Sequence, residues 1–431
     1  MRHPDGRPAR LERGRDRPST ANDGRSVSRR ARMSPDGPEP LRVLVLAPTP
    51  FFGDRGCHIR IYEEVKGLAA LGVDSTIVTY PSGRDLPDVR IHRATSIPGI
   101  RARELGPSWT RPLLDLSLWR TAHRVARRFR PHVIHAHLHE GIAIGTRLRT
   151  SLAVPLVADL QGSLAGELVH HGFLPNRGLR RRLVQQIEAW LSRQPDLVLT
   201  SSAHGITWLT EHGVPAARIE ALPDGVELER FRPLPPDEAL RAQLGLVGKR
   251  VVVFLGVLTP YQGVDLLLDA AVRVVADVPD AHFLVMGYPN EDRYRDEIRA
   301  RGLQAAVTLP GRIPYDEASR WLGLGQVGVS PKQSLTEANG KLLNYMACGL
   351  PVVASETPVN RELLGDQGIY AAVGDADALA QRLVDALKDA EGGRRRGDAL
   401  RRRAEDLFAW PVLAARLATL YRRLTATTPP R

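Results

Sequence analysis

The chain has 431 residues, is 43% hydrophobic and contains only two cysteines, Cys57 and Cys348. This length can build two domains of about 150 to 200 residues each, and so few cysteines exclude a disulfide framework and favour a reducing compartment, the cytoplasm. The formal net charge of +12 fits nucleic acid, an anionic membrane surface or an anionic substrate, and the position of the charge along the chain has to decide among them.

The N-terminal region differs from the rest. Residues 1–40 contain ten arginines and six acids and almost no apolar residues, so we predict that residues 1–41 form a disordered basic tail. Nothing in this tail resembles a module that binds RNA or DNA, and we expect no nucleic-acid partner. In the whole sequence no apolar stretch reaches the roughly 18 to 20 residues of a membrane span, and the N-terminus lacks the apolar core of a secretory signal.

A strand is predicted over residues 43–47 and a helix over residues 59–71, joined by the glycine-bearing loop PTPFFGDRGCH. This order resembles a phosphate-binding strand-loop-helix but lacks the full dinucleotide glycine fingerprint, so a structural loop is an equal alternative. Two further strands are predicted over residues 75–80 and 89–92.

The next segment is rich in arginine. Residues 84–130 hold eleven arginines and four acids, together with Trp109, Trp119 and a leucine cluster. Helical spacing over residues 113–129 gives an apolar face flanked by arginine, which suits a helix on an anionic membrane surface. A helix that packs on the core with a solvated basic face is the alternative.

The run VIHAHLH at residues 133–139 predicts a strand with three histidines on one side. A zinc site is one interpretation, but no second group of ligands stands out, and we favour a site lined by neutral histidines. Strand and loop follow at residues 155–163, then a basic helix at 179–191 and a strand at 197–201. The Pro-Asp-Gly turn at residues 223–225 and the prolines after it predict a hinge between two sheets.

The second half repeats the alternation of strand and helix. Strands are predicted over residues 250–256, 283–287, 307–310, 327–330 and 351–354, as in a doubly wound sheet, and the last helix over residues 412–424. A helix over residues 341–348, with Asn339 as its N-cap, follows a loop that carries Lys332, Thr336 and Glu337. Helix N-termini at the carboxyl ends of strands attract anions, and a carboxylate accepts hydrogen bonds from sugar hydroxyls, so a nucleotide sugar is the ligand we expect.

Two stretches resemble a known family. MACGLPVVA at residues 346–354 and IEALPDGVELERFRP at residues 219–233 are similar to the donor-site motif and the interdomain crossover of family 4 retaining glycosyltransferases, the glycosyl transferases of group 1. The family's pair of donor-site glutamates is altered, because Asn344 occupies the second position, Thr336 the first, and Glu337 lies one place late. An asparagine amide can also hold a ribose.

The resemblance implies an α/β fold of the GT-B type, with two Rossmann-like doubly wound domains facing a central cleft. The implied boundaries are residues 42–233 for an acceptor-side domain, 234–408 for a nucleotide-sugar domain, and 409–426 for a helix that returns to the first domain. Residues that relatives use on the diphosphate are replaced by Val257 and Gln262, and Lys341 and Lys332 are the obvious substitute cations.

Carried over position by position, the resemblance implies three groups of site residues. The catalytic group is Glu337, Lys341 and Asp159; the donor-binding group is Gly56, Gln161, Gly256, Gln262, Lys332, Thr336, Asn339, Gly340 and Asn344; the acceptor-side group is Arg55, His58, His139 and Glu167. Gln161 stands where many relatives carry a histidine beside the donor sugar.

The implied reaction moves a sugar from a nucleotide-sugar donor to a hydroxyl of a glycan, lipid-linked or small-molecule acceptor, with retention and without a metal or other cofactor. We expect a cytoplasmic protein, peripheral on the inner face of the cell membrane if the arginine-rich helix binds anionic lipid. A nucleotide-sugar epimerase or phosphorylase of the same fold and a catalytically silent relative that binds sugar nucleotides are the alternatives.

Overall fold

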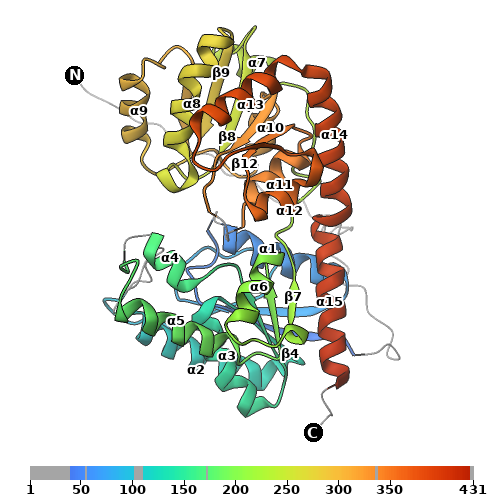
Figure 1. Cartoon of the computed structure of the whole chain (residues 1–431). Coiled ribbons are helices and arrows are strands. Elements are labelled where there is room, and N and C mark those ends of the chain that lie inside the picture. Colours follow the sequence, from blue (N-terminus) through green and yellow to red (C-terminus); the bar gives the residue numbers. More distant parts are fainter. Residues whose placement is uncertain (1–38, 54–55, 101–109, 171–172, 335–337, 428–431) are drawn as a thin grey trace, which may run out of the picture. The chain divides into compact units, whose positions relative to one another are not determined.

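The computed structural model describes residues 39–53, 56–100, 110–170, 173–334 and 338–427. The predicted disordered tail at residues 1–41 therefore lies almost entirely outside the described residues. From Pro40 onward the chain forms one compact unit that contains two parallel β-sheets (Figure 1).

The first sheet has seven parallel strands in the order β3-β2-β1-β4-β5-β6-β7. Its strands are β1 (Arg42–Ala47), β2 (Asp74–Thr79), β3 (Ile91–Arg93), β4 (Val133–His137), β5 (Leu156–Leu160), β6 (Leu197–Thr200) and β7 (Ile219–Ala221). Its helices are α1 (Gly56–Ala70), α2 (Arg111–Phe129), α3 (Leu138–Leu152), α4 (Leu164–His170), α5 (Leu179–Ser192), α6 (Ala203–Glu211) and the 3₁₀ turn η1 (Ala216–Arg218).

The second sheet has six parallel strands in the order β10-β9-β8-β11-β12-β13. Its strands are β8 (Arg250–Leu255), β9 (Ala281–Met286), β10 (Val307–Gly311), β11 (Val327–Ser330), β12 (Val352–Ser355) and β13 (Ile369–Ala371). Its helices are α7 (Glu238–Gln243), η2 (Pro260–Gln262), α8 (Val264–Asp277), α9 (Glu291–Ala300), α10 (Ala318–Leu322), α11 (Gly340–Ala347), α12 (Pro358–Leu364), η3 (Gly365–Gln367), α13 (Ala376–Lys388) and α14 (Ala390–Leu407).

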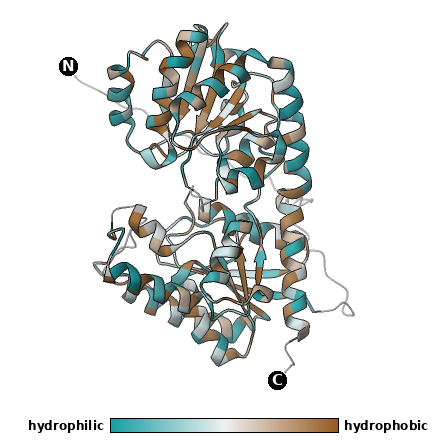
Figure 2. Ribbon diagram, viewed as in Figure 1, coloured by the Kyte–Doolittle hydropathy of each residue, from teal (hydrophilic) through white to brown (hydrophobic). Residues whose placement is uncertain are grey.

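Both sheets are covered on two faces, which explains why their strands are continuous apolar runs. On β1, Leu44 and Leu46 belong to one buried cluster, whereas Val43 and Val45 belong to another that includes residues of α15 (Trp410–Thr427). Figure 2 shows the same pattern, with brown strands inside helices that alternate between brown and teal. Two doubly wound α/β domains are therefore present, as the sequence predicted.

The order of the strands fixes where ligands can bind. In the first sheet the direction of winding reverses between β1 and β4, and in the second it reverses between β8 and β11. The crevice beyond the carboxyl ends of such a pair of strands is the usual ligand site of an open α/β sheet. The segments that directly follow β1, β4, β8 and β11 are therefore the ones expected to line a ligand site.

The chain passes between the two sheets twice, and the two passages pair with each other. Val226 and Ala409 form an isolated parallel bridge, with Val226 N–H donating to Phe408 O at 2.8 Å and Trp410 N–H donating to Val226 O at 3.3 Å. Gly225 is needed here because a Cβ would lie 2.5 Å from the Trp410 ring. After this bridge α15 packs against α1, and Tyr421 reaches His135 at 2.7 Å.

Three local expectations are corrected by the structure. The strand predicted over residues 133–139 ends at His137, because Leu138 turns the chain with a φ of 61° and begins α3, which also contains His139. Asn339 stands at the N-cap of α11, but its side chain accepts no capping hydrogen bond. On α2, Leu114 and Leu118 are buried in the core whereas Leu113 and Leu116 are exposed, so the leucine cluster is divided between a packing face and the surface. Among the described residues, no helix is both long and apolar enough to cross a membrane.

Candidate active site

The amino group of Lys341 lies at the carboxyl edge of the second sheet, where the winding reverses. Lys341 is the second residue of α11, and its Nζ donates to Gln262 Oε1 at 2.7 Å. It also lies 4.4 Å from the centre of the Phe254 ring. Gly256 directly follows β8, and a Cβ there would lie 2.9 Å from Lys341 Nζ, so glycine leaves room for the amine. The structure thus brings together the predicted donor-binding residues Gly256 and Gln262 and the predicted catalytic residue Lys341.

Burial works against the charge of Lys341. Removal from water, and secondly the charge of Lys332, lowers the pKa of Lys341 well below its usual value. Lys332 is itself 5% exposed and donates from Nζ to Ala338 O at 2.7 Å. An anion bound beside Lys341 would favour its charged form, so the amine is suited to a ligand that brings negative charge.

The loop before α11 is only partly described. Thr336 and Glu337 lie outside the described residues, so the structure says nothing of these two predicted contacts. Asn339 is 3% exposed and donates to Ser330 Oγ at 3.0 Å and to Asn360 Oδ1 at 2.8 Å. This buried amide is committed to joining β11, α11 and α12, which corrects its expected role as a donor contact. Gly340 begins α11, and Asn344 lies one turn further along it, half-buried.

Arg60 organises the corresponding edge of the first sheet. This arginine of α1 is 1% exposed and forms a bidentate pair with Asp159 of β5, at 2.8 Å and 3.1 Å. It also donates to Asp224 Oδ1 at 2.8 Å and to Leu222 O at 3.0 Å, and so ties β5 to the first passage between the sheets. Burial alone would lower the pKa of Arg60, but Asp159, Glu64 and Asp224 hold it above the usual value, so the guanidinium stays charged.

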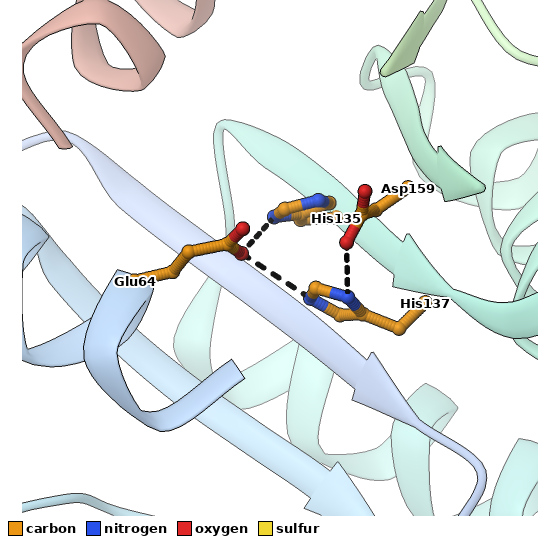
Figure 3. Close-up of side chains that lie close together, drawn as sticks. All are labelled: Glu64, His135, His137 and Asp159. Atoms are coloured by element: carbon orange, nitrogen blue, oxygen red, sulfur yellow. Dashed lines mark hydrogen bonds and ion pairs between the residues drawn. The ribbon is translucent and has the colours of Figure 1, made fainter. Parts of the chain in front are cut away.

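Four side chains gather beside Arg60, as Figure 3 shows: Glu64 from α1, His135 and His137 from β4, and Asp159. His137 Nδ1 lies 3.0 Å from Asp159 Oδ2, whereas Glu64 Oε2 lies 3.7 Å from His137 Nε2 and 4.0 Å from His135 Nδ1. One possible ligand atom of each residue lies within 4.8 Å of the others. Two histidines and two carboxylates at such distances are the residue types that can hold a metal ion.

The donor set nevertheless fits a metal poorly. Arg60 Nε lies 3.0 Å from Glu64 Oε1 and 2.8 Å from Asp159 Oδ2, so a guanidinium already provides the positive charge between the two carboxylates. His135 Nδ1 is engaged by Tyr421 Oη. We therefore assign Arg60 as the counter-ion of this buried cluster.

The titration of the cluster follows from its burial. Burial raises the pKa of Glu64 to about 7 against the opposing attraction of Arg60. Burial also acts to raise the pKa of Asp159, but the Arg60 guanidinium and the His137 hydrogen bond outweigh it and hold that pKa well below its usual range. His135 stays neutral, because burial and then the neighbouring His137 lower its pKa.

These contacts correct two further expectations. Asp159 is 1% exposed, so it positions β5 and α1 and is not available for a sugar hydroxyl. His58 is also buried; its Nδ1 accepts from Gly53 N–H at 2.9 Å and its Nε2 bonds to Thr49 Oγ1, so it holds the loop after β1 in shape. Gly56 starts α1 and has open space at its Cβ position. Arg55 lies outside the described residues.

His139 and Glu188 stabilise the loop after β5. His139 Nε2 lies 3.5 Å from Glu188 Oε1, and Glu188, which is 0% exposed, accepts from Leu164 N–H at 2.7 Å and Ser163 Oγ at 3.2 Å. The negative carboxylate at the start of α4 fits the positive end of that helix. The predicted residue Glu167 lies within α4, but its side chain is outside what the structure describes.

A cavity opens at the carboxyl ends of β5 and β6, and it contains the predicted residue Gln161. Its lining consists of Leu160, Gln161, Gly162, Ser163, Thr200, His204, Gly205, Trp208 and Leu209. Gln161 Nε2 donates to Asp159 Oδ2 at 3.2 Å, which connects the cavity to the Arg60 cluster. The half-buried Trp208 offers an apolar ring and His204 a polar group, a combination that can hold a sugar ring.

Sequence reasoning missed Arg60, Glu64, Glu188 and Trp208. Arg60 and Glu64 are four residues apart and lie on the buried face of α1, directly before Ile61 and Val65 respectively. An arginine and a glutamate four residues apart on an apolar helix face were the sequence pattern that could have indicated a buried ion pair. Trp208 lies in α6, which the sequence analysis did not predict, so no signal pointed to it.

Two family models match this chain, one over the part that forms the first sheet and one over the part that forms the second. Residues 55–225 match a family model described as glycosyl transferase 4-like domain, and residues 249–389 match one described as glycosyl transferases group 1. D-inositol 3-phosphate glycosyltransferase of Thermobispora bispora is 27% identical over 401 residues, covering 86% of this chain and 91% of that protein. Glycogen synthase of Mycobacterium tuberculosis is 26% identical over 390 residues, covering 88% and 86%.

Solved structures resemble the fold as a whole. Sucrose-phosphate synthase from Thermosynechococcus elongatus superposes with a TM-score of 0.76 at 20% identity, covering 90% of this chain and 99% of that one. Anabaena HepE in complex with UDP gives a TM-score of 0.73 at 18% identity, covering 89% and 100%. At these identities the likeness concerns the fold.

Proposed function

We propose a specific reaction from one premise: this chain belongs to the glycosyl transferases of group 1 and is a glycosyltransferase with the GT-B fold. It transfers the sugar of a nucleoside diphosphate sugar to an acceptor hydroxyl and retains the configuration at the anomeric carbon. The reaction takes place in the cytoplasm and requires no metal. The sugar-nucleotide donor is supported by relatives such as HepE, whose structures contain UDP and UDP-glucose.

The observation that carries this proposal is the amine of Lys341 beside Gln262 and Gly256. In a reaction that expels a nucleoside diphosphate, negative charge grows on the departing phosphate, and a cation already in place stabilises it without reorganisation. Lys341 lies in the first turn of α11, where helix N–H groups also favour an anion. Together they take the place of the basic residues that Val257 and Gln262 replace.

The acceptor would approach from the first domain. The cavity with Gln161, His204 and Trp208 provides an apolar ring next to polar groups, as sugar recognition requires. We propose that Glu337 and Asn344 contact the donor sugar and the ribose, respectively. The acceptor hydroxyl then attacks on the face from which the diphosphate leaves, and the departing phosphate accepts its proton.

The experiment is a panel of UDP-, GDP- and ADP-sugars offered to the full chain with and without simple sugar and lipid-linked acceptors. We expect release of one nucleoside diphosphate, unaffected by EDTA, and a product whose anomeric proton coupling in NMR matches that of the donor. An inverted product would refute retention. Interconversion of free donor sugars would support the epimerase alternative, and no turnover of any donor with bound nucleotide would support a silent relative.

A further inference from the structure

Helix α5 carries an exposed stripe of large apolar side chains. Leu179 is 83% exposed, Leu183 56%, Ile187 47% and Trp190 52%. The spacing of four, four and three residues places all four on one side of the helix over three turns. In the described part of the chain this face has no covering, and an exposed apolar face of this length marks an interaction site.

The opposite side of α5 attaches the helix to the protein. Glu188, Leu191 and Ser192 are buried, and Glu188 is the residue that holds the start of α4. The stripe is therefore displayed outward by a helix whose inner face is fixed. Because the inner face of α5 is already packed against the protein, the stripe is a separate face of the helix that points outward.

The charges around the stripe are of one sign. Arg177, Arg180, Arg182 and Arg193 are exposed beside or at the ends of the stripe. The one acid of α5, Glu188, is buried on the other side. A helix with an aliphatic and tryptophan stripe bordered by arginine has the composition of helices that lie in the interface of an anionic membrane.

We propose that α5 docks this protein onto a membrane surface that contains anionic phospholipid. The apolar stripe enters the boundary between headgroups and acyl chains, and the arginines contact lipid phosphates. The charged side chains exposed beside the stripe on α5 and its flanks are all arginines, so charge complementarity favours an anionic lipid surface over a partner protein with a mixed rim.

This assignment moves the membrane contact away from α2. On α2 the exposed leucines are Leu113, at 49%, and Leu116, at 41%, and the acid Asp115 lies between them in sequence. Leu114 and Leu118 of the same helix are in the core. The arginine-rich sequence around α2 therefore lacks the continuous outward stripe that α5 has.

Docking through α5 bears on the acceptor. Glu188 of α5 binds the loop residues Ser163 and Leu164, and Ser163 lines the cavity that contains Gln161. A membrane held at α5 is thus one helix away from the cavity proposed for the acceptor, which favours an acceptor carried on a lipid. That consequence rests on the proposed function, whereas membrane docking itself does not.

The experiment is co-sedimentation of the full chain with vesicles of phosphatidylcholine alone or mixed with phosphatidylglycerol. We expect binding to the anionic vesicles at low salt that weakens as salt rises, because the attraction decays within about 8 Å at physiological ionic strength. The double variant Leu183→Gln/Ile187→Gln should weaken partitioning at least about tenfold. Arg180→Gln/Arg182→Gln should weaken it selectively for anionic vesicles.

The matched control is Leu113→Gln/Leu116→Gln on α2, which should bind vesicles like the wild type. Circular dichroism and melting temperature check that every variant is folded, and donor turnover without vesicles should equal that of the wild type. Equal vesicle binding by the α5 variant and the wild type would overturn the proposal, as would loss of binding in the α2 control. A dimer of the wild type that the α5 variant abolishes, without vesicle binding, would identify a second copy as the occupant instead. Because turnover is measured separately, failure of docking is distinguishable from failure of the proposed reaction.

Discussion

At the scale of single residues, the most informative side chain is Lys341. Its amine is paired with the neutral Gln262 amide and faces the Phe254 ring, so none of these contacts supplies a negative charge. A buried lysine loses its proton more readily than one in water, and for this reason the pKa of Lys341 is lowered. A bound diphosphate would raise that pKa again, because its negative charge favours the protonated amine.

We predict that Lys341→Ala lowers kcat/KM at least about 100-fold, which corresponds to roughly 2.7 kcal/mol of transition-state stabilisation. In the wild type, affinity for nucleoside diphosphate should fall as the pH rises, because only the protonated amine attracts the anion and its lowered pKa brings deprotonation to lower pH. Calorimetric titration of nucleoside diphosphate across the pH range measures this. Lys388→Ala, on the exposed surface of α13, is the control, and near-normal kinetics of Lys341→Ala would remove Lys341 from the site.

Lys341 and Gln262 were both named from the sequence, each from its own strand-loop-helix segment, and the structure places their side chains in contact; their roles toward a donor stay predictions. Asp159, His58 and Asn339 lie in surroundings that the sequence did not predict, for a common reason. Asp159 lies near the end of β5, His58 in the first turn of α1 and Asn339 directly before α11, but each is buried and hydrogen-bonded to other residues of the chain. Position along the sequence predicts the edge, and burial decides whether a polar group there faces ligand or protein.

At the scale of elements, helix α1 shows what a hydrophobic pattern leaves out. Its existence was predicted to within three residues at its start, from the apolar spacing that includes Ile61, Val65 and Leu68. The same buried face carries Arg60 and Glu64, which meet strands β4 and β5 through His137 and Asp159. Periodicity gives no information on such an ion pair, because its partners come from strands about 70 to 100 residues away.

We predict that Glu64 makes the folded protein less stable as the pH rises from 5 to 8. Its pKa of about 7 in the folded state is raised, so the folded protein binds the proton more tightly than the unfolded chain and loses that advantage as the pH passes through this range. The loss amounts to about 2 to 3 kcal/mol. Asp159 does not oppose it there, since its lowered pKa places its titration at more acidic pH.

Urea unfolding of the wild type and Glu64→Gln at pH 5 and pH 8 measures this effect. The variant should show a smaller decrease in unfolding free energy between the two values, by about that amount. Glu211→Gln, an exposed glutamate at the end of α6, should behave like the wild type. Parallel pH dependence in Glu64→Gln and the wild type would contradict the assigned titration.

At the scale of the whole molecule, the two doubly wound sheets could be predicted because buried parallel strands appear as short runs of β-branched and aliphatic residues. The predicted strands agree with the observed ones within about two residues at most ends, apart from the strand that ends at His137. The contact of Tyr421 with His135 spans 286 residues, and no local pattern could have indicated it. The predicted boundaries at residues 233 and 408 stay predictions.

The bridge between Val226 and Ala409 has a consequence for how the protein could be taken apart. The chain leaves the first sheet at Val226 and returns at Ala409, and these two residues are hydrogen-bonded neighbours. In topological terms, everything between them is an insertion into a shorter protein made of residues 40–226 and 409–427. That shorter protein already contains all seven strands of the first sheet and the α15 residues that complete its core.

We therefore predict that joining residue 226 to residue 409 through about six glycine and serine residues yields a monomer that unfolds cooperatively. Because the two backbones run parallel, the linker has to double back from residue 226 to the start of residue 409, and since these residues are neighbours a short linker suffices and the entropy of closing it is small. Gel filtration and the near-ultraviolet circular dichroism of the remaining tryptophans would report whether the shortened chain folds. The same chain with Trp410→Ala should fail to fold, because the Trp410 ring packs over Gly225. If the shortened chain remains unfolded, the two halves depend on each other. If it folds, the inserted half is a replaceable module, and under the proposed function donor choice could be exchanged between relatives by grafting at these two positions alone.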